Sequence, residues 1–206
     1  AQAADPIQVG ILHRADFAYA KMMAHAYSMA LEEINASGGI KGSPLALSFA
    51  DDKGVPDVGV QAVKSLVRQE RVVLLLGGYS SSNTLHMAFA ADRLDTPFLV
   101  STAADDHITQ HNLENIFRLN PPASQYTQAL EAFLLERVRP GAMAIVYENS
   151  PYGTGGARRM MAFCRDHGIV INGIYPYFKD AASEGYLQRV LAPIQDHPPE
   201  VIFLVA

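Results

Sequence analysis

The sequence predicts an α/β protein built from two doubly wound parallel-sheet lobes, of which the second is incomplete in this chain. Strand-like and helix-like segments alternate throughout the 206 residues, as they do in βαβ units. Residues 72–76 form a near-continuous apolar run, which is typical of a strand in a sheet that helices cover on both faces. Pro121 and Pro122 interrupt the alternation, which then restarts, so we place the boundary between the lobes there.

The first lobe is expected to span residues 1–120. Its first strand is indicated by apolar residues at period two, and its first helix by one apolar stripe at helical spacing. The strand residues are Ile7, Val9 and Ile11, and the stripe residues are Met22, Ala26, Met29 and Ala30. The helix is expected to end at residues 37–39, which read Ser-Gly-Gly. Further strands are expected near residues 45–49, 72–76 and 98–100, with helices near 62–67 and 87–94 between them.

The second lobe is expected to span residues 121–206. The pattern predicts helices near residues 130–138, 157–164 and 187–194, and strands near 143–146, 169–174 and 201–205. Nothing follows the last apolar strand, which leaves one face of its sheet uncovered. We therefore expect this lobe to be truncated.

Composition and charge exclude several classes of partner. The net charge is −5 and no cluster of Lys and Arg is present, so neither nucleic acid nor an anionic membrane surface is an expected partner. No apolar run approaches the roughly 20 residues that a membrane-spanning helix requires. Residues 1–5 resemble the small-residue stretch around a signal-peptidase cut, which predicts a secreted, periplasmic protein. Cys164 is the single cysteine, and no N-terminal cysteine is present to carry a lipid anchor.

Three loops follow predicted strands, where open parallel sheets bind ligands. In residues 77–84, hydroxyls and backbone amides are suited to a carboxylate, although Ser81 or Ser82 would also serve as a simple helix cap. In residues 101–107, Asp105 offers a carboxylate to a ligand ammonium group, or caps the following turn. Residues 148–156 present Tyr152 at a glycine-rich turn that otherwise reads as a plain loop. We expect the turns after Leu76 and Val100 to grip a polar head group together.

Enzymatic motifs are missing from the sequence. The dinucleotide fingerprint fails because Arg158 stands where a third glycine is needed after Gly153 and Gly155, and the P-loop and nucleophile-elbow patterns are absent. Cys164 is expected on the buried stripe of a helix, where thiols are usually inert. His107 and His111 would suit a metal if their segment were helical, but loop histidines are commoner. We expect no catalytic residue, cofactor or metal.

Five segments together resemble one known family, the leucine/isoleucine/valine-binding type of periplasmic substrate-binding protein. They read LEEINASGGIKG at 31–42, FADDKGVPDVGVQAVKSLV at 49–67, LLGGYSSSNT at 75–84, FRLNPPASQ at 117–125 and YENSPYGTGG at 147–156. Their order and spacing cover the whole chain. The resemblance implies the type I periplasmic-binding-protein fold, in which two lobes joined by hinge strands close over a solute.

The same resemblance implies a function and a set of contacts. The function is the extracytoplasmic solute-binding component of an ABC uptake transporter, with a membrane permease as partner and an amino acid or related polar metabolite as ligand. The first lobe would carry most of the site. The family's contacts fall on Tyr19, Tyr79, Ser80, Ser81, Ala103, Ala104, Asp105 and Tyr152. In that picture Ser81 holds a ligand carboxylate, the Ala103 carbonyl accepts from the ligand amine, and Tyr19 and Tyr152 wall the pocket.

Two alternatives remain at this point. A receptor or regulator module of the same fold would sense an amide or amino acid and signal through a partner chain, and the leader-like N-terminus argues against it. A nucleotide-dependent α/β enzyme is less consistent with the missing motifs.

Two positions depart from the family pattern. Asp105 stands where Thr or Ser is usual, and Arg14 lies in a loop that is usually small and rich in Gly and Pro. Arg14 would reach an anionic group by a bidentate contact, or is simply a solvated surface residue.

We hypothesise that Arg14 and Asp105 together select a zwitterionic or amide-bearing solute over a plain aliphatic amino acid. Calorimetric titration of Asp105→Thr with amino acids and amides is expected to change the order of ligand preference. An unchanged order would refute the hypothesis.

Overall fold

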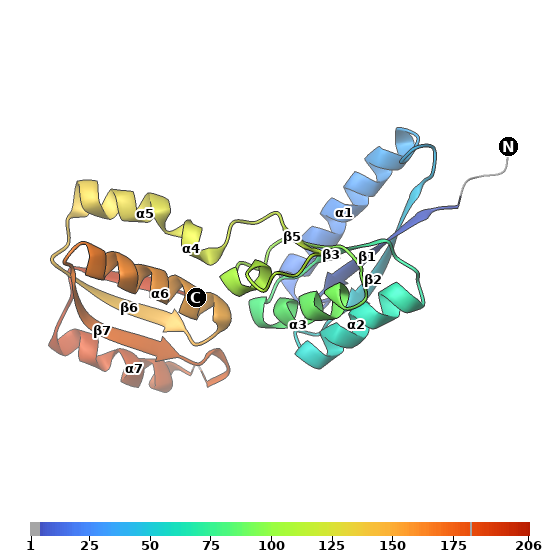
Figure 1. The fold of residues 1–206 in the computed structure, drawn as a ribbon. Coiled ribbons are helices and arrows are strands. Elements are labelled where there is room, and N and C mark those ends of the chain that lie inside the picture. Colours follow the sequence, from blue (N-terminus) through green and yellow to red (C-terminus); the bar gives the residue numbers. More distant parts are fainter. Residues whose placement is uncertain (1–4, 182) are drawn as a thin grey trace. The chain divides into compact units, whose positions relative to one another are not determined.

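The computed structural model describes residues 5–181 and 183–206, so residues 1–4 of the leader-like stretch at residues 1–5 lie outside the described residues. The chain forms two compact units. The first contains the residues up to Ala103 together with His107–Asn120, and the second contains Ala104–Asp106 together with Pro121–Ala206. Each unit has its own parallel sheet (Figure 1). The predicted α/β class with doubly wound parallel sheets is confirmed.

The first unit is built on a five-stranded parallel sheet in the order β2-β1-β3-β4-β5. Its strands are β1 (Ile7–His13), β2 (Leu45–Asp51), β3 (Leu74–Gly77), β4 (Phe98–Val100) and β5 (Ile116–Arg118). Its helices are α1 (Ala18–Ala36), α2 (Pro56–Arg68) and α3 (Ser81–Asp92). A short 3-10 turn, η1 (Asp106–Thr109), begins at the last residue of the Ala104–Asp106 segment and continues in this unit. Because all five strands are parallel, their carboxyl ends meet at one edge of the sheet.

The strand order reverses at β1, and this reversal places the helices. The connection from β1 to β2 runs one way across the sheet and the connection from β2 to β3 runs the other. Since crossovers between parallel strands are right-handed as a rule, the two helices are expected on opposite faces. Accordingly α1 lies across the sheet from α2 and α3, which pack together (Figure 1). The core between the sheet and this helix pair includes the fully buried Leu12, Val63, Leu75 and Met87.

The apolar stripe predicted on the first helix does not face the sheet. Met22 and Met29 are 69% and 70% exposed. The packed side of α1 instead carries the buried Ala20 and the half-buried Met23 and Tyr27. Alanine and methionine occur on both sides of this helix, so apolar spacing alone does not tell which side meets the sheet.

The second unit is built on a three-stranded parallel sheet in the order β7-β6-β8. Its strands are β6 (Ala142–Glu148), β7 (Val170–Tyr177) and β8 (Val201–Val205). Its helical segments are α4 (Ala123–Tyr126), α5 (Gln128–Phe133), a π turn η2 (Leu134–Val138), α6 (Pro151–Asp166), a 3-10 turn η3 (Lys179–Ala181) and α7 (Glu184–Asp196). The core between α6 and the sheet includes Met143, Ile145, Met160 and Cys164. The predicted burial of Cys164 is confirmed, and burial raises the pKa of its thiol.

Helix α6 begins within the segment that reads as a glycine-rich loop. Pro151 occupies the first turn, and the hydroxyl of Ser150 accepts a hydrogen bond from the Gly153 N–H at 3.2 Å. A side chain at Gly153 would stand 2.0 Å from the Glu148 carbonyl oxygen. The glycine thus allows the helix to start close to the end of β6, and the interpretation of residues 151–156 as a loop was wrong.

A buried carboxylate ties α5 to α6 in the second unit. Glu131 is 7% exposed and accepts hydrogen bonds from the Thr127 hydroxyl at 2.7 Å and from Arg159 Nε at 2.7 Å, while Arg159 Nη2 contacts its second oxygen. Burial raises the pKa of Glu131, but the hydrogen bonds from Arg159 and Thr127 outweigh it, so the pKa lies below its ordinary value of 4.5.

Replacing Arg159 with Met is therefore expected to lower the free energy of unfolding at pH 7 by about 2 kcal/mol, because Glu131 keeps a buried charge without its cation. A group with a lowered folded-state pKa contributes stability above its unfolded pKa and loses it as the pH falls. The difference between wild type and variant should thus shrink below about pH 4.5. Urea unfolding followed by circular dichroism at pH 7 and pH 3.5 measures both effects. The control is Arg158→Met on the exposed side of α6, and an equally large loss there, or a loss independent of pH, would contradict the assignment.

Candidate ligand-binding site

The turns that follow β3 and β4 are hydrogen-bonded to each other. The Gly77 carbonyl accepts from the Ser101 N–H at 2.8 Å, and the Gly78 carbonyl accepts from the Ala103 N–H at 3.0 Å. The Ser101 hydroxyl also donates to the Gly77 carbonyl at 3.2 Å. The segments after Leu76 and Val100 therefore lie side by side at the carboxyl edge of the sheet.

Two glycines allow the chain to turn sharply at the end of β3. Gly77 and Gly78 have φ angles of +125° and +82°, a region that residues with side chains rarely adopt. A side chain on Gly77 would stand 2.0 Å from the Leu12 carbonyl oxygen of β1, and one on Gly78 would stand 2.8 Å from Thr84 of α3. Because these glycines lack side chains, the end of β3 can lie close to β1, and α3 can begin only a few residues after β3.

The first turn of α3 supplies polar groups to this edge. Ser80 is the N-cap and makes no side-chain cap bond, because its hydroxyl pairs with the Ser82 hydroxyl at 3.2 Å. The alternative in which Ser81 or Ser82 is the cap is therefore wrong. Ser81 is 7% exposed. The amino end of a helix carries partial positive charge and favours anions.

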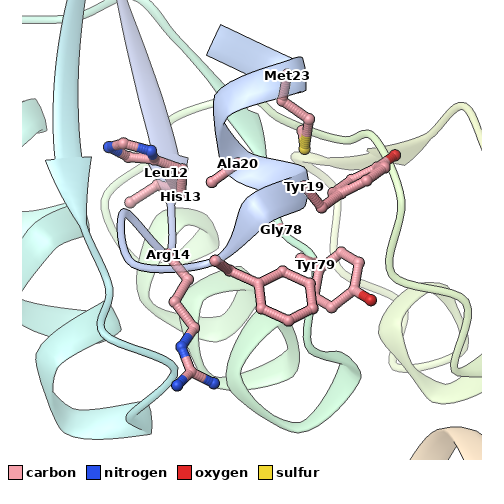
Figure 2. Close-up of a pocket in the computed structure, with 9 residues that line it drawn as sticks. Leu12, His13, Arg14, Tyr19, Ala20, Met23, Gly78 and Tyr79 are labelled. Atoms are coloured by element: carbon pink, nitrogen blue, oxygen red, sulfur yellow. The ribbon is translucent and has the colours of Figure 1, made fainter.

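Three aromatic rings gather beside these turns, and we call Phe17, Tyr19 and Tyr79 the aromatic cluster. The ring centroids of Phe17 and Tyr79 are 5.0 Å apart, and those of Tyr19 and Tyr79 are 5.1 Å apart. Phe17 is the N-cap residue of α1 and Tyr19 lies in its first turn. Figure 2 shows the Tyr19 and Tyr79 rings side by side, with the Met23 sulfur beside Tyr19. The starts of α1 and α3 thus meet through these side chains.

A shallow hollow opens around the aromatic cluster. It is lined by Leu12, His13, Arg14, Phe17, Tyr19, Ala20, Met23, Gly78 and Tyr79. The Thr102 hydroxyl donates to the Met23 sulfur at 3.9 Å, which links the hollow to the turn after β4. Of the predicted site residues, Arg14, Tyr19 and Tyr79 line the hollow, whereas Ser80, Ser81 and Ala103 lie in the adjoining turns.

Sequence reasoning missed Phe17 and Met23. Met23 lies four residues after Tyr19 and therefore shares its side of α1. Phe17 stands directly before α1 in extended conformation and reaches the Tyr79 ring from there. The spacing of four residues between Tyr19 and Met23 is the sequence signal that could have identified Met23.

Two charged side chains at this edge, Arg14 and Asp16, pair with each other. Arg14 Nε donates to Asp16 at 2.8 Å, and this bond raises the pKa of Arg14 and lowers the pKa of Asp16. Both side chains are exposed, so water screens the pair. The guanidinium carbon of Arg14 also stands 6.0 Å from the centre of the Phe17 ring. Nearby, burial raises the pKa of Asp52, which is 3% exposed.

Three predicted site residues belong to the second unit. Ala104 is buried, and its carbonyl accepts from the Ala123 N–H at 2.7 Å. Asp105 is 2% exposed. Tyr152 is half-buried in the first turn of α6. The structure thus divides the predicted residues between the two units.

His107 and His111 are the remaining sequence candidates. His107 lies in the 3-10 turn η1 and not in an α-helix, and its ring centroid is 6.2 Å from that of His111. Among residues 5–181 and 183–206, no three His, Cys, Asp or Glu side chains are grouped to hold a metal ion. Within the same residues, none of the helices has the length and apolar character to cross a membrane.

Comparison with known families decides the identity of the fold. The model of the family described as periplasmic binding protein matches residues 6–206. The chain belongs to the periplasmic binding protein family. The resemblance expected from the five sequence segments is therefore confirmed, and the family is one of substrate-binding proteins.

A curated relative of this periplasmic binding protein is "Leu/Ile/Val-binding protein homolog 7" of Brucella abortus. The two are 28% identical over 163 residues, which are 74% of this chain and 41% of the relative. The chain thus spans about two fifths of the length of the curated relatives it matches.

Solved structures share the fold at lower sequence identity. The branched-chain amino acid transporter substrate binding protein LivJ of Streptococcus pneumoniae, in complex with isoleucine, superposes with a TM-score of 0.83 at 19% identity and covers 97% of this chain and 56% of its own. A solute binding protein from R. palustris, in complex with 4-hydroxybenzoate, superposes with a TM-score of 0.82 at 19% identity and covers 98% of this chain and 54% of its own. The type I periplasmic-binding-protein fold is confirmed by these likenesses.

The glycine turn in this periplasmic binding protein can be tested by adding a methyl group. Gly77→Ala is expected to lower the free energy of unfolding by about 3 kcal/mol or to prevent folding, because it combines a strained φ with a clash against Leu12. Gly38→Ala is the matched control, since Gly38 has a φ of +96° but a Cβ added there would meet no neighbouring atom within 4 Å. That variant should lose only about 1 kcal/mol. Equal losses in thermal and urea unfolding would show that the close approach of β1 and β3 is unimportant.

Proposed function

We propose that this protein binds a small carboxylate-bearing solute, an amino acid or a related polar metabolite, with the carboxylate at the start of α3. We further propose that it is the extracytoplasmic, periplasmic solute-binding component of an ABC uptake transporter and delivers this solute to a membrane permease.

The observation that carries the proposal is the joining of the two turns through Gly77 and Gly78. It sets the Ser80–Ser82 segment, with its hydroxyls and the positive end of α3, beside the turn that contains Ala103. Ser81 and the amides of this helix start are suited to a carboxylate, and the Ala103 carbonyl is suited to an ammonium group. Tyr19 and Tyr79 supply an apolar wall next to them.

The relatives support the transport role. The Brucella relative is named for leucine, isoleucine and valine, and the Streptococcus structure is named as a transporter substrate binding protein. The Streptococcus and R. palustris structures hold different ligands, isoleucine and 4-hydroxybenzoate, both of which carry a carboxylate. The two ligands share a carboxylate and differ in the rest of the molecule, which is consistent with the carboxylate site proposed for this chain.

The proposal assigns further contacts to Ala104, Asp105 and Tyr152 of the second unit. Asp105 offers an acceptor for a ligand amine or amide, and Tyr152 offers apolar area at little cost in conformational entropy. Arg14 is the weakest member of the proposed set, because Asp16 already engages its guanidinium.

Ser81→Ala tests the carboxylate site. The variant is expected to bind the best ligand found in a screen of amino acids, amides and aromatic acids about 10- to 100-fold more weakly, because one hydrogen bond to a charged group is lost. Isothermal titration calorimetry measures the affinity, after a thermal-shift screen has identified the ligand. Ser65→Ala on α2, whose hydroxyl bonds Gln69, is the control and should bind as the wild type does. Equal affinities for wild type and Ser81→Ala would remove Ser81 from the site, and enzymatic turnover of the ligand would contradict a pure binding role.

A further inference from the structure

The aromatic cluster concentrates three rings at the proposed site from two separate loops. Phe17 and Tyr19 come from the start of α1, and Tyr79 comes from the turn between β3 and α3. Their centroid separations of 5.0 and 5.1 Å are within the range at which aromatic rings attract one another. The cluster therefore places one continuous aromatic surface beside the polar groups of α3.

Part of this surface is left uncovered in the first unit. Tyr19 is 36% exposed and Tyr79 is 43% exposed, although both rings line the hollow. Met23, whose sulfur accepts a hydrogen bond from the Thr102 hydroxyl, also lines the hollow. Figure 2 shows it beside Tyr19. Exposed aromatic area next to polar groups is the usual composition of a small-molecule site.

The position of Arg14 bears on whether the cluster takes an aromatic or a cationic ligand. Aromatic rings bind both planar rings and cations such as quaternary ammonium groups. Here the Arg14 guanidinium, held by Asp16, already stands 6.0 Å from the Phe17 ring centre. A ligand cation would compete with Arg14 for that ring, whereas a ligand ring can lie against the exposed Tyr79.

We propose that the aromatic cluster selects solutes whose apolar part is an aromatic ring, held against Tyr79 with the carboxylate at the start of α3. This inference rests on the proposed function and names the ligand class for the same site. Tyr79 is the specificity-determining residue because it contacts both other rings and directly precedes the Ser80–Ser82 segment.

The test compares probes that share a head group and differ in aromaticity. L-phenylalanine is paired with L-cyclohexylalanine, and benzoate with cyclohexanecarboxylate, and affinities are measured by calorimetry. In at least one pair the aromatic member is expected to bind about 2- to 10-fold more tightly, which corresponds to one favourable ring pair. Trimethylglycine, which carries a quaternary ammonium group, is expected to bind more weakly than either aromatic probe.

Variants at Tyr79 test whether the preference for aromatic probes arises from the aromatic cluster. Tyr79→Leu is expected to remove the preference within the pair, and Tyr79→Phe is expected to retain it. Phe133→Leu, which changes an exposed ring on α5 of the second unit, should leave the preference unchanged. Circular dichroism confirms that each variant is folded.

Three results would overturn the inference. If both members of each pair bind measurably and with equal affinity, the aromatic preference is refuted, but the proposed carboxylate site is not. Tightest binding by trimethylglycine would show that the cluster is a cation site. Failure of all five probes to bind, each of which carries a carboxylate, together with failure of a wider screen of carboxylates, would refute the proposed function and this inference with it.

Discussion

The carbonyl oxygens of Gly77 and Gly78 hold the proposed site together, because they accept the hydrogen bonds that join the turn after β3 to the turn after β4. The bonds require the chain to leave β3 with two successive positive φ angles. They also require that no side chain stand between Gly77 and the Leu12 carbonyl oxygen of β1. If this turn were changed, the start of α3, the ring of Tyr79 and the segment at Ala103 would lose their common position.

The strand order supplies the second condition. Because the sheet reverses direction at β1, the loops after β1 and β3 leave the carboxyl edge toward helices on opposite faces. The amino ends of α1 and α3 therefore come together at that edge, and Phe17, Tyr19 and Tyr79 pack across the gap between them. Helix starts attract anionic groups and aromatic rings attract apolar ones, so the edge is suited to a solute with both parts.

Much of this arrangement could be predicted from the sequence, and the failures have specific causes. The alternation of segments and the buried run near Leu75 predicted the parallel sheet, because strand periodicity depends on local residues. The packed side of α1 was not predictable, since Met22 and Met23 are equally apolar and only the position of the sheet decides which is covered. The early start of α6 was missed because glycine normally weakens a helix, whereas Gly153 is needed for close approach to Glu148. The pairing of Arg14 with Asp16 depends on the fold of one loop, which no pattern of spacing reveals.

The central claim is that the turns after Leu76 and Val100 together grip the polar head of a solute. Two-dimensional 1H–15N nuclear magnetic resonance tests it most directly, by following backbone amides while the tightest-binding carboxylate ligand is added. The account predicts that the amides of residues 78–83 and 101–103 show the largest chemical-shift changes within the first unit. The chemical shifts of amides in the second half of α1, away from its start at the sheet edge, should not change. Saturable binding that shifts amides elsewhere in the first unit, while residues 78–83 and 101–103 remain unperturbed, would contradict the account.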